Sequence, residues 1–155
     1  PLPAGLHVRA FNHPLGVSDI AFFMRSEETG KLQGDFPMCL DGEPLLLPSP
    51  GSALRRRLDD WFEQVGVAPF PIAEFADSAL MKAFGQAGAA IFPGPIAIEN
   101  EICQMYGVDV VGRTSEIQER YYAISHERRL KHPAVLAIIE AARHDLFAST
   151  VSPQK

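Results

Sequence analysis

The chain has 155 residues, of which 46% are hydrophobic and 21% charged, enough for a packed core and too few charges for a disordered segment. Its net charge of −5 disfavours binding of a phosphate backbone by this chain itself. The longest apolar stretch, residues 88–98, is interrupted at Pro93–Pro95, which excludes a transmembrane helix of about 20 residues. The chain has two cysteines, Cys39 and Cys103, which are too few for a disulfide framework. Both have apolar neighbours, so we expect them to be small core residues of a cytosolic protein.

The sequence opens with Pro1 and Leu2 rather than with a methionine. No basic stretch precedes an apolar one there, so this end does not match a secretory signal peptide. We expect the chain to be a segment that begins inside a longer protein.

The first expected elements are strands. Residues 6–11 alternate apolar and polar side chains, as a half-buried strand does, and residues 12–16 have the composition of a turn. Residues 20–24 and 44–47 are continuous apolar runs, which are typical of buried strands.

A helix is expected after the second of these runs. Ser52 can cap it, its apolar residues recur at helical spacing, and Gly66 can end it. The three arginines at 55–57 fall on its polar face, with the acidic residues at 59–60 as partners within reach. Residues 70–75 form the next expected strand, at a sheet edge because the segment contains a proline.

Two further helices are expected, each after a strand. Asp77 or Ser78 can cap the second helix. Its expected buried face comprises Leu80, Met81 and Phe84. After a short strand over residues 89–92, Pro95 suits the first turn of the third helix.

The C-terminal part is expected to hold two strands and a helix. The strands cover residues 108–111 and 121–125 and are separated by a polar link. Pro133 opens the final helix, and residues 149–155 are a polar tail. The apolar face of that helix comprises Val135, Ile138, Ile139, Ala142 and Leu146. Because strands alternate with helices, the sequence predicts an α/β fold with mostly parallel sheets flanked by helices.

The sequence carries no motif of a nucleotide-binding, hydrolytic or metalloprotease site. His126 and His132 are six residues apart, which matches no common metal-ligand spacing. We therefore expect no catalytic residue, no metal site and no cofactor, and we do not expect an enzyme.

The three helices expected after strands begin at Ser52, Ser78 and Pro95. In an α/β sheet the carboxyl ends of parallel strands line a crevice, where helix N-termini present free N–H groups. A small ligand could bind at that edge, although ordinary strand-to-helix connections would produce the same pattern.

Much of the sequence resembles the effector-binding domain of LysR-type transcriptional regulators. The resemblance covers residues 6–148 and rests on EFADSALMKAFG, IFPGP, ERYYAISHERR and KHPAV. Within the family these phrases are most similar to the branch that activates sodium/proton antiporter genes.

The resemblance implies a two-lobed fold of the periplasmic-binding-protein type 2 class, with an incomplete first lobe. Residues 1–25 and 111–148 would belong to lobe I and residues 26–110 to lobe II, followed by the tail 149–155. The DNA-binding winged helix-turn-helix of the family is expected outside this chain.

The resemblance also implies where the effector binds, namely between the lobes. On the second lobe the corresponding positions are Phe75, Asp77, Ser78, Phe92, Pro93, Gly94, Ser49 and Ser52. Asp77 would oppose an anion at this place; it could suit a cation or simply cap its helix.

The implied function is effector sensing and oligomerisation in a cytoplasmic DNA-binding activator. Its partners would be a small molecule or an ion such as Na⁺ or Li⁺, further copies in a homodimer or tetramer, and DNA through the absent domain alone. No membrane contact is implied. The alternative is a fragment of a solute-binding receptor with the same fold and no role in transcription.

Overall fold

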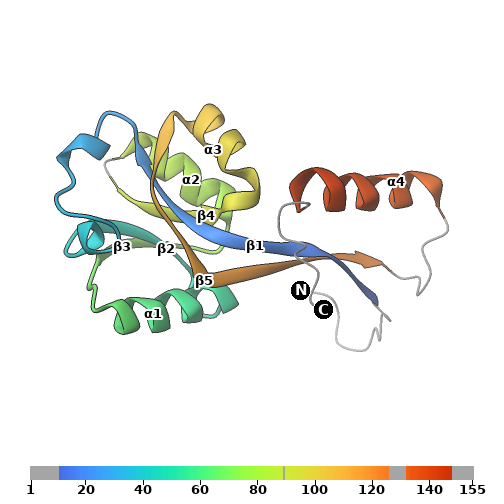
Figure 1. Ribbon diagram of the computed structural model, residues 1–155, viewed down its shortest axis with the longest axis horizontal. Coiled ribbons are helices and arrows are strands. Elements are labelled where there is room, and N and C mark those ends of the chain that lie inside the picture. The colour runs from blue at the N-terminus through green and yellow to red at the C-terminus, as the bar shows by residue number, and fades with distance from the viewer. Residues whose placement is uncertain (1–10, 89, 126–131, 148–155) are drawn as a thin grey trace. The chain divides into compact units, whose positions relative to one another are not determined.

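A computed structural model describes residues 11–88, 90–125 and 132–147 (Figure 1). The chain divides into two compact units, a larger one over Asp19–Glu119 and a smaller one that combines both chain ends. Two long strands, β1 (Phe11–Arg25) and β5 (Val108–Ser125), contribute residues to both units. No helix in the described part of the chain is long and apolar enough to cross a membrane.

The larger unit is built on a mixed sheet. Strands β2 (Pro44–Pro48) and β3 (Phe70–Phe75) are parallel, whereas β4 (Phe92–Pro95) runs antiparallel to β1. The strand order around β1 is β4-β1-β5, and a parallel bridge between Leu45 and Ile91 connects β2 to the segment before β4. The α/β class is confirmed, and the antiparallel pairing of β1 with β4 makes the sheet mixed.

Three α-helices cover this sheet, α1 on one side and α2 and α3 on the other (Figure 1). They span Ala53–Val65, Ser78–Ala87 and Glu99–Tyr106. Short 3-10 helices occupy Thr29–Lys31, Met38–Leu40 and Ile96–Ile98. Ser52 caps α1, and Gly66 ends it with a φ of 71°, a left-handed conformation that favours glycine. Both predicted ends of this helix are therefore confirmed.

The apolar strands have two buried faces. Phe22 and Leu45 contribute to a core on the α1 side, where the Phe22 ring stacks on Trp61 at 5.5 Å. Phe23 and Leu46, their sequence neighbours, contribute to the core on the α2 side. Because alternate residues of a strand point to opposite faces, continuous apolar runs are what a sheet covered on both sides requires.

Long strands replace two segments predicted as irregular. Residues 12–16 lie in β1 rather than in a turn, and residues 112–120 lie in β5 rather than in a polar link. Pairing between β1 and β5 decides both cases, because strand contacts distant in sequence leave little trace in local composition. Similarly, Pro95 ends β4, so α3 begins later than predicted, at Glu99. Of the strand predicted over residues 6–11, residues 6–10 lie outside the described part.

Helix α2 buries a different face from the one that the sequence predicted. Met81 is buried as expected, but Leu80 and Phe84 are 51% and 55% exposed. Lys82 and Gly85 lie inward with Met81 instead. The absence of a side chain at Gly85 allows the helix to approach the Phe92 ring, and this close contact determines which face of α2 meets the sheet.

The smaller unit holds helix α4 (Pro133–Ala141), which begins at Pro133 as predicted and continues as a π-helical segment over Ala142–Leu146. Arg143 donates two hydrogen bonds to the carbonyl oxygen of Pro14, at 2.7 and 3.0 Å. Within this unit the Tyr121 and Phe147 rings pack at 5.3 Å. These contacts attach the C-terminal helix to strands of its own unit.

Replacing Gly85 by alanine is expected to destabilise the larger unit. A Cβ atom there would lie 2.2 Å from the Phe92 ring, and overpacking of this kind costs about 1–3 kcal/mol. Trp61, the single tryptophan and only 3% exposed, reports unfolding by its fluorescence in a urea titration. Gly30→Ala is the matched control because nothing lies within 4 Å of its Cβ position. Equal unfolding midpoints for the two variants would contradict this packing.

Candidate functional site

The turns that follow β2 and β3 lie next to each other. The backbone N–H of Ser49 donates to the carbonyl oxygen of Phe75 at 2.8 Å, and the N–H of Ser52 donates to the carbonyl oxygen of Ser49 at 3.0 Å. These bonds bring together three of the predicted effector residues at the carboxyl end of a parallel strand pair. That is the edge at which α/β sheets bind ligands.

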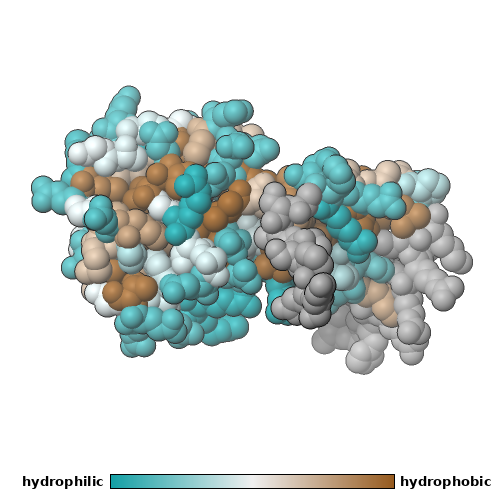
Figure 2. Space-filling model, in the orientation of Figure 1, coloured by the Kyte–Doolittle hydropathy of each residue, from teal (hydrophilic) through white to brown (hydrophobic). Residues whose placement is uncertain are grey.

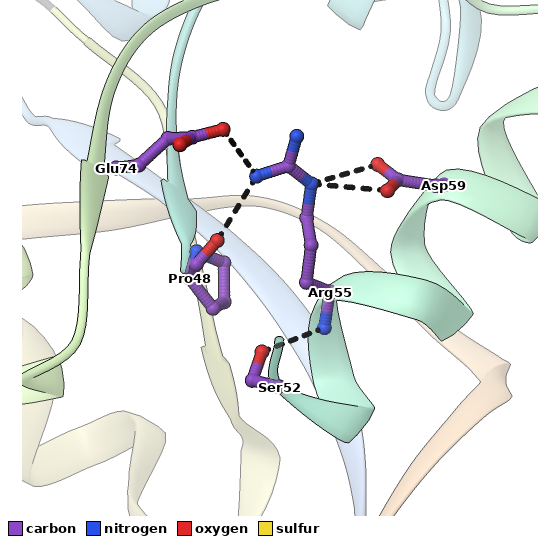
Figure 3. Close-up of polar contacts among 5 residues, drawn as sticks. All are labelled: Pro48, Ser52, Arg55, Asp59 and Glu74. Carbon is purple, nitrogen blue, oxygen red and sulfur yellow. Dashed lines mark hydrogen bonds and ion pairs between the residues drawn. The ribbon is translucent and has the colours of Figure 1, made fainter. Parts of the chain in front are cut away.

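The Arg55 side chain connects α1 to the ends of β2 and β3 through hydrogen bonds and ion pairs (Figure 3). Its Nε donates to Asp59 Oδ1 at 2.9 Å, and its Nη1 donates to Glu74 Oε1 at 2.7 Å and to the Pro48 carbonyl oxygen at 3.0 Å. The Glu74 carboxylate raises the pKa of the Arg55 guanidinium, which therefore stays charged. One side chain thus holds the first turn of α1 to the ends of both β2 and β3.

The sequence pointed to only part of this arrangement. The expected pairing of the arginine segment with an acidic residue one turn later is confirmed for Asp59. The contact with Glu74 joins residues 19 positions apart and had no local signal. The Arg55 side chain is 14% exposed, so it is a connection between elements rather than a solvated surface charge.

Asp77 caps helix α2, which confirms the capping interpretation. Its Oδ1 accepts hydrogen bonds from the N–H groups of Ala79 and Leu80, at 2.7 and 3.0 Å. These two bonds hold the pKa of the Asp77 carboxyl below its usual range. Ser78, the first residue of the helix, is exposed beside this carboxylate. The turn therefore presents a negative charge and a short polar side chain to solvent.

Lys82 is a charged residue of this region that the sequence analysis did not identify. Lys82 is only 9% exposed and lies on the inward side of α2. Burial lowers the pKa of the Lys82 ammonium, while the carboxylates of Asp77 and Glu119 act in the opposite direction. The sequence gives no sign that this lysine is buried, because lysines of amphipathic helices are mostly exposed.

The predicted residues on β4 lie deeper than those of the other two turns. The Phe92 ring is fully buried and stacks on Phe23 at 5.5 Å, and Pro93 is also buried. A Cβ atom at Gly94 would lie 3.1 Å from the Phe23 ring. Phe75 is half-buried and packs on Phe84 at 5.2 Å. The exposed polar candidates are thus Asp77 and Ser78 in the turn after β3, whereas Ser49 and Ser52 in the turn after β2 are half-buried.

The larger unit also has a pocket of about 350 Å³, which contains none of the predicted effector residues. It is lined by Thr29, Leu32, Gly34, Asp35, Phe36, Cys39, Val110 and Val111. Among the described residues no group of three His, Cys, Asp or Glu side chains is placed to hold a metal ion. The His126–His132 pair is not fully described, because residues 126–131 lie outside the described part.

Comparison with known sequences identifies related regulators. The family model of the LysR substrate binding domain matches residues 37–146. The transcriptional activator protein NhaR of Escherichia coli K12 is 35% identical over 141 residues, which are 91% of this chain and 46% of NhaR. NhaR of Shigella flexneri matches to the same extent. The chain therefore spans about half the length of the curated relatives it matches.

Solved structures share the fold. DarR of Vibrio fischeri in complex with DNA has a TM-score of 0.62 at 24% identity, covering 92% of this chain and 46% of DarR. The effector-binding domain of QuiR with shikimate has a TM-score of 0.58 at 16% identity, covering 91% and 67% of the two chains. The CcmR regulatory domain of Synechocystis with 2-PG has a TM-score of 0.59 at 13% identity, covering 90% and 68%.

Replacing Arg55 by lysine is expected to lower the free energy of unfolding by about 1 kcal/mol. A lysine cannot reach the three acceptors with a planar fork, but Asp59 and Glu74 are 54% and 43% exposed, so solvent screens both ion pairs. Urea unfolding at low salt measures the difference. Arg56→Lys is the control, because Arg56 makes one 3.4 Å contact with the Gly51 carbonyl oxygen. The proposed connection is refuted if the two variants are equally stable.

Proposed function

We propose that this chain, which belongs to the LysR substrate-binding domain family, is the effector-binding domain of a transcriptional activator. The observation that carries the proposal is its 35% identity with NhaR over 91% of the chain. Sequence-specific DNA contact belongs to the winged helix-turn-helix that accompanies this domain, not to a chain of net charge −5. A solute-binding receptor without a role in transcription is the less supported alternative, because the curated relatives are transcriptional activators.

In this proposal the larger unit acts as lobe II and the smaller unit as part of lobe I. The division at Ser18/Asp19 and Glu119/Arg120 supports it, although these borders differ from 25/26 and 110/111. Strands β1 and β5 serve as the two connections between the lobes. The effector binds on lobe II at the turns that hold Ser49, Ser52, Phe75, Asp77 and Ser78, together with Phe92, Pro93 and Gly94 of the buried strand β4.

We further propose that the regulator containing this domain acts in the cytoplasm and controls sodium/proton antiporter genes. The domain would do so by binding an effector and not by catalysing a reaction. The similarity to NhaR supports it. Na⁺ or Li⁺ is one candidate effector, which the exposed carboxylate of Asp77 favours. A small organic molecule that binds at the same turns is the other candidate effector.

A bulky side chain at Ser78 is expected to abolish induction without weakening DNA binding. In the full-length protein carrying Ser78→Trp, the response of an antiporter-promoter reporter to NaCl, LiCl and organic acids should fall at least about tenfold. Band shifts on the promoter should be unchanged. Ser115→Trp, at an exposed position of β5, is the control. A normal response of the Ser78 variant would exclude this turn as the effector site, and wild-type protein without sequence-specific DNA binding would exclude the function.

We also propose that the chain self-associates through α4. Ile138 is 68% exposed, and Val135, Leu136 and Leu146 are 38–39% exposed. Apolar atoms are visible among polar ones over this helix in Figure 2. Exposed apolar faces of this kind are typical of protein interfaces.

Sedimentation at micromolar concentration is expected to give a dimer or larger species. Ile138→Glu should weaken the association at least about tenfold, because a charge would be buried in an apolar contact. Ala137→Glu places the same charge on a neighbouring exposed position and is the control. A wild-type monomer of 17.0 kDa would rule out this interface.

A further inference from the structure

The pocket of about 350 Å³ lies between the segment that follows β1 and the first residues of β5. Its volume is at the lower end of the range of small-molecule sites, which is about 300–1,000 Å³. All of its lining residues belong to the larger unit, and none of them lies in the turns after β2 and β3 or in β4. A ligand bound there would therefore be additional to one at the predicted effector positions.

The apolar wall of this pocket is continuous with the hydrophobic core. Leu32, Phe36 and Val111 all line the pocket and pack against the core on the α1 side. A Cβ atom at Gly112 of β5 would lie 2.2 Å from the Phe36 ring, and this ring stacks on Trp61 at 5.9 Å. Close packing thus holds the wall in place, and it offers a fixed apolar surface to the body of a ligand.

The polar side chains of the pocket are the carboxylate of Asp35, the hydroxyl of Thr29 and the thiol of Cys39. Asp35 is exposed, and within the described part of the chain no hydrogen bond or ion pair engages its carboxylate. The Thr29 hydroxyl donates to the carbonyl oxygen of Ser26 at 3.0 Å, which leaves its own oxygen able to accept. The pocket therefore has oxygen acceptors for the N–H groups of a ligand.

The charge around the pocket is negative. Burial raises the pKa of the Cys39 thiol, and the carboxylates of Glu43 and Asp35 raise it further. The basic residue nearest in sequence, Lys31, is already paired with Glu28 at 2.5 Å. An anion would therefore be repelled, whereas a cation would gain an ion pair with Asp35. The apolar wall gives nothing to a bare metal ion, and no group of three His, Cys, Asp or Glu side chains among the described residues could hold one.

We propose that this pocket binds a small organic ammonium ion, a primary amine with an apolar alkyl or aryl body. The ammonium donates to the Asp35 carboxylate and to the Thr29 hydroxyl oxygen, and the body lies against Leu32, Phe36 and Val111. The inference goes beyond the proposed function, because it concerns a site that the effector turns do not contain.

The test is calorimetric titration of the full-length protein with the hydrochlorides of isobutylamine and phenethylamine. Isobutanol and 2-phenylethanol carry the same apolar bodies without the charge, and NaCl at equal ionic strength tests an inorganic cation. We expect at least one amine to bind and the matching alcohol to bind at least about tenfold more weakly.

Substitutions locate the bound amine. Asp35→Asn, which removes the charge, and Leu32→Trp, which fills the pocket, should each weaken amine binding at least about tenfold. Asp60→Asn is the matched control, because Asp60 is an exposed aspartate of α1 that does not line the pocket. Asp77→Asn should also bind the amine normally, since Asp77 belongs to the effector turn. Thermal melts of all variants distinguish lost binding from lost folding.

The inference is overturned if neither amine binds, if the alcohols bind as tightly as the amines, or if NaCl shows the same dependence on Asp35. It is also overturned if the folded Asp35→Asn and Leu32→Trp variants bind the amine as tightly as the wild type. Loss of binding in Asp77→Asn alone would assign the amine to the effector turn and not to this pocket.

Discussion

The burial of both faces of β1 and β2 is the constraint on which the larger unit depends. Ile20, Ala21, Phe22 and Phe23 are all fully buried, and they divide alternately between two cores. Burial of a large side chain such as Ile20, Phe22 or Phe23 stabilises the fold by about 1.5–3 kcal/mol. Helices must therefore cover both sides of the sheet, and the turns that lead into those helices are brought to one edge.

Polar side chains then give that edge its shape. Ser52 and Asp77 accept the first N–H bonds of α1 and α2, and Arg55 connects α1 to Glu74 and to the Pro48 carbonyl oxygen. These contacts place the two strand-to-helix turns side by side before any ligand arrives.

The charges near α2 come from Asp77 at its N-terminus and Lys82 on its inward side. Asp77 offers an exposed carboxylate, but its Oδ1 already serves as a helix cap. Burial lowers the pKa of the Lys82 ammonium, while the carboxylates of Asp77 and Glu119 act in the opposite direction.

The sequence alone determined the local features of this protein. Contacts within a few residues, which composition and spacing record, produce the caps at Ser52 and Asp77, the end of α1 at Gly66 and the helix start at Pro133. The α/β class and the family motifs were likewise visible without coordinates. Only the tertiary structure decided the long course of β1 and β5, since their pairing joins residues far apart in the chain.

The same distinction applies to the candidate site. Ser49, Ser52 and Phe75 could be named from the sequence through the family resemblance, and their proximity results from the parallel pairing of β2 and β3. The Arg55–Glu74 contact and the burial of Lys82 could not be named, because both depend on how α1 and α2 pack on the sheet. Gly85 sets the rotation of α2 through its contact with Phe92, a residue on another element, and so places Lys82 inside rather than in solvent.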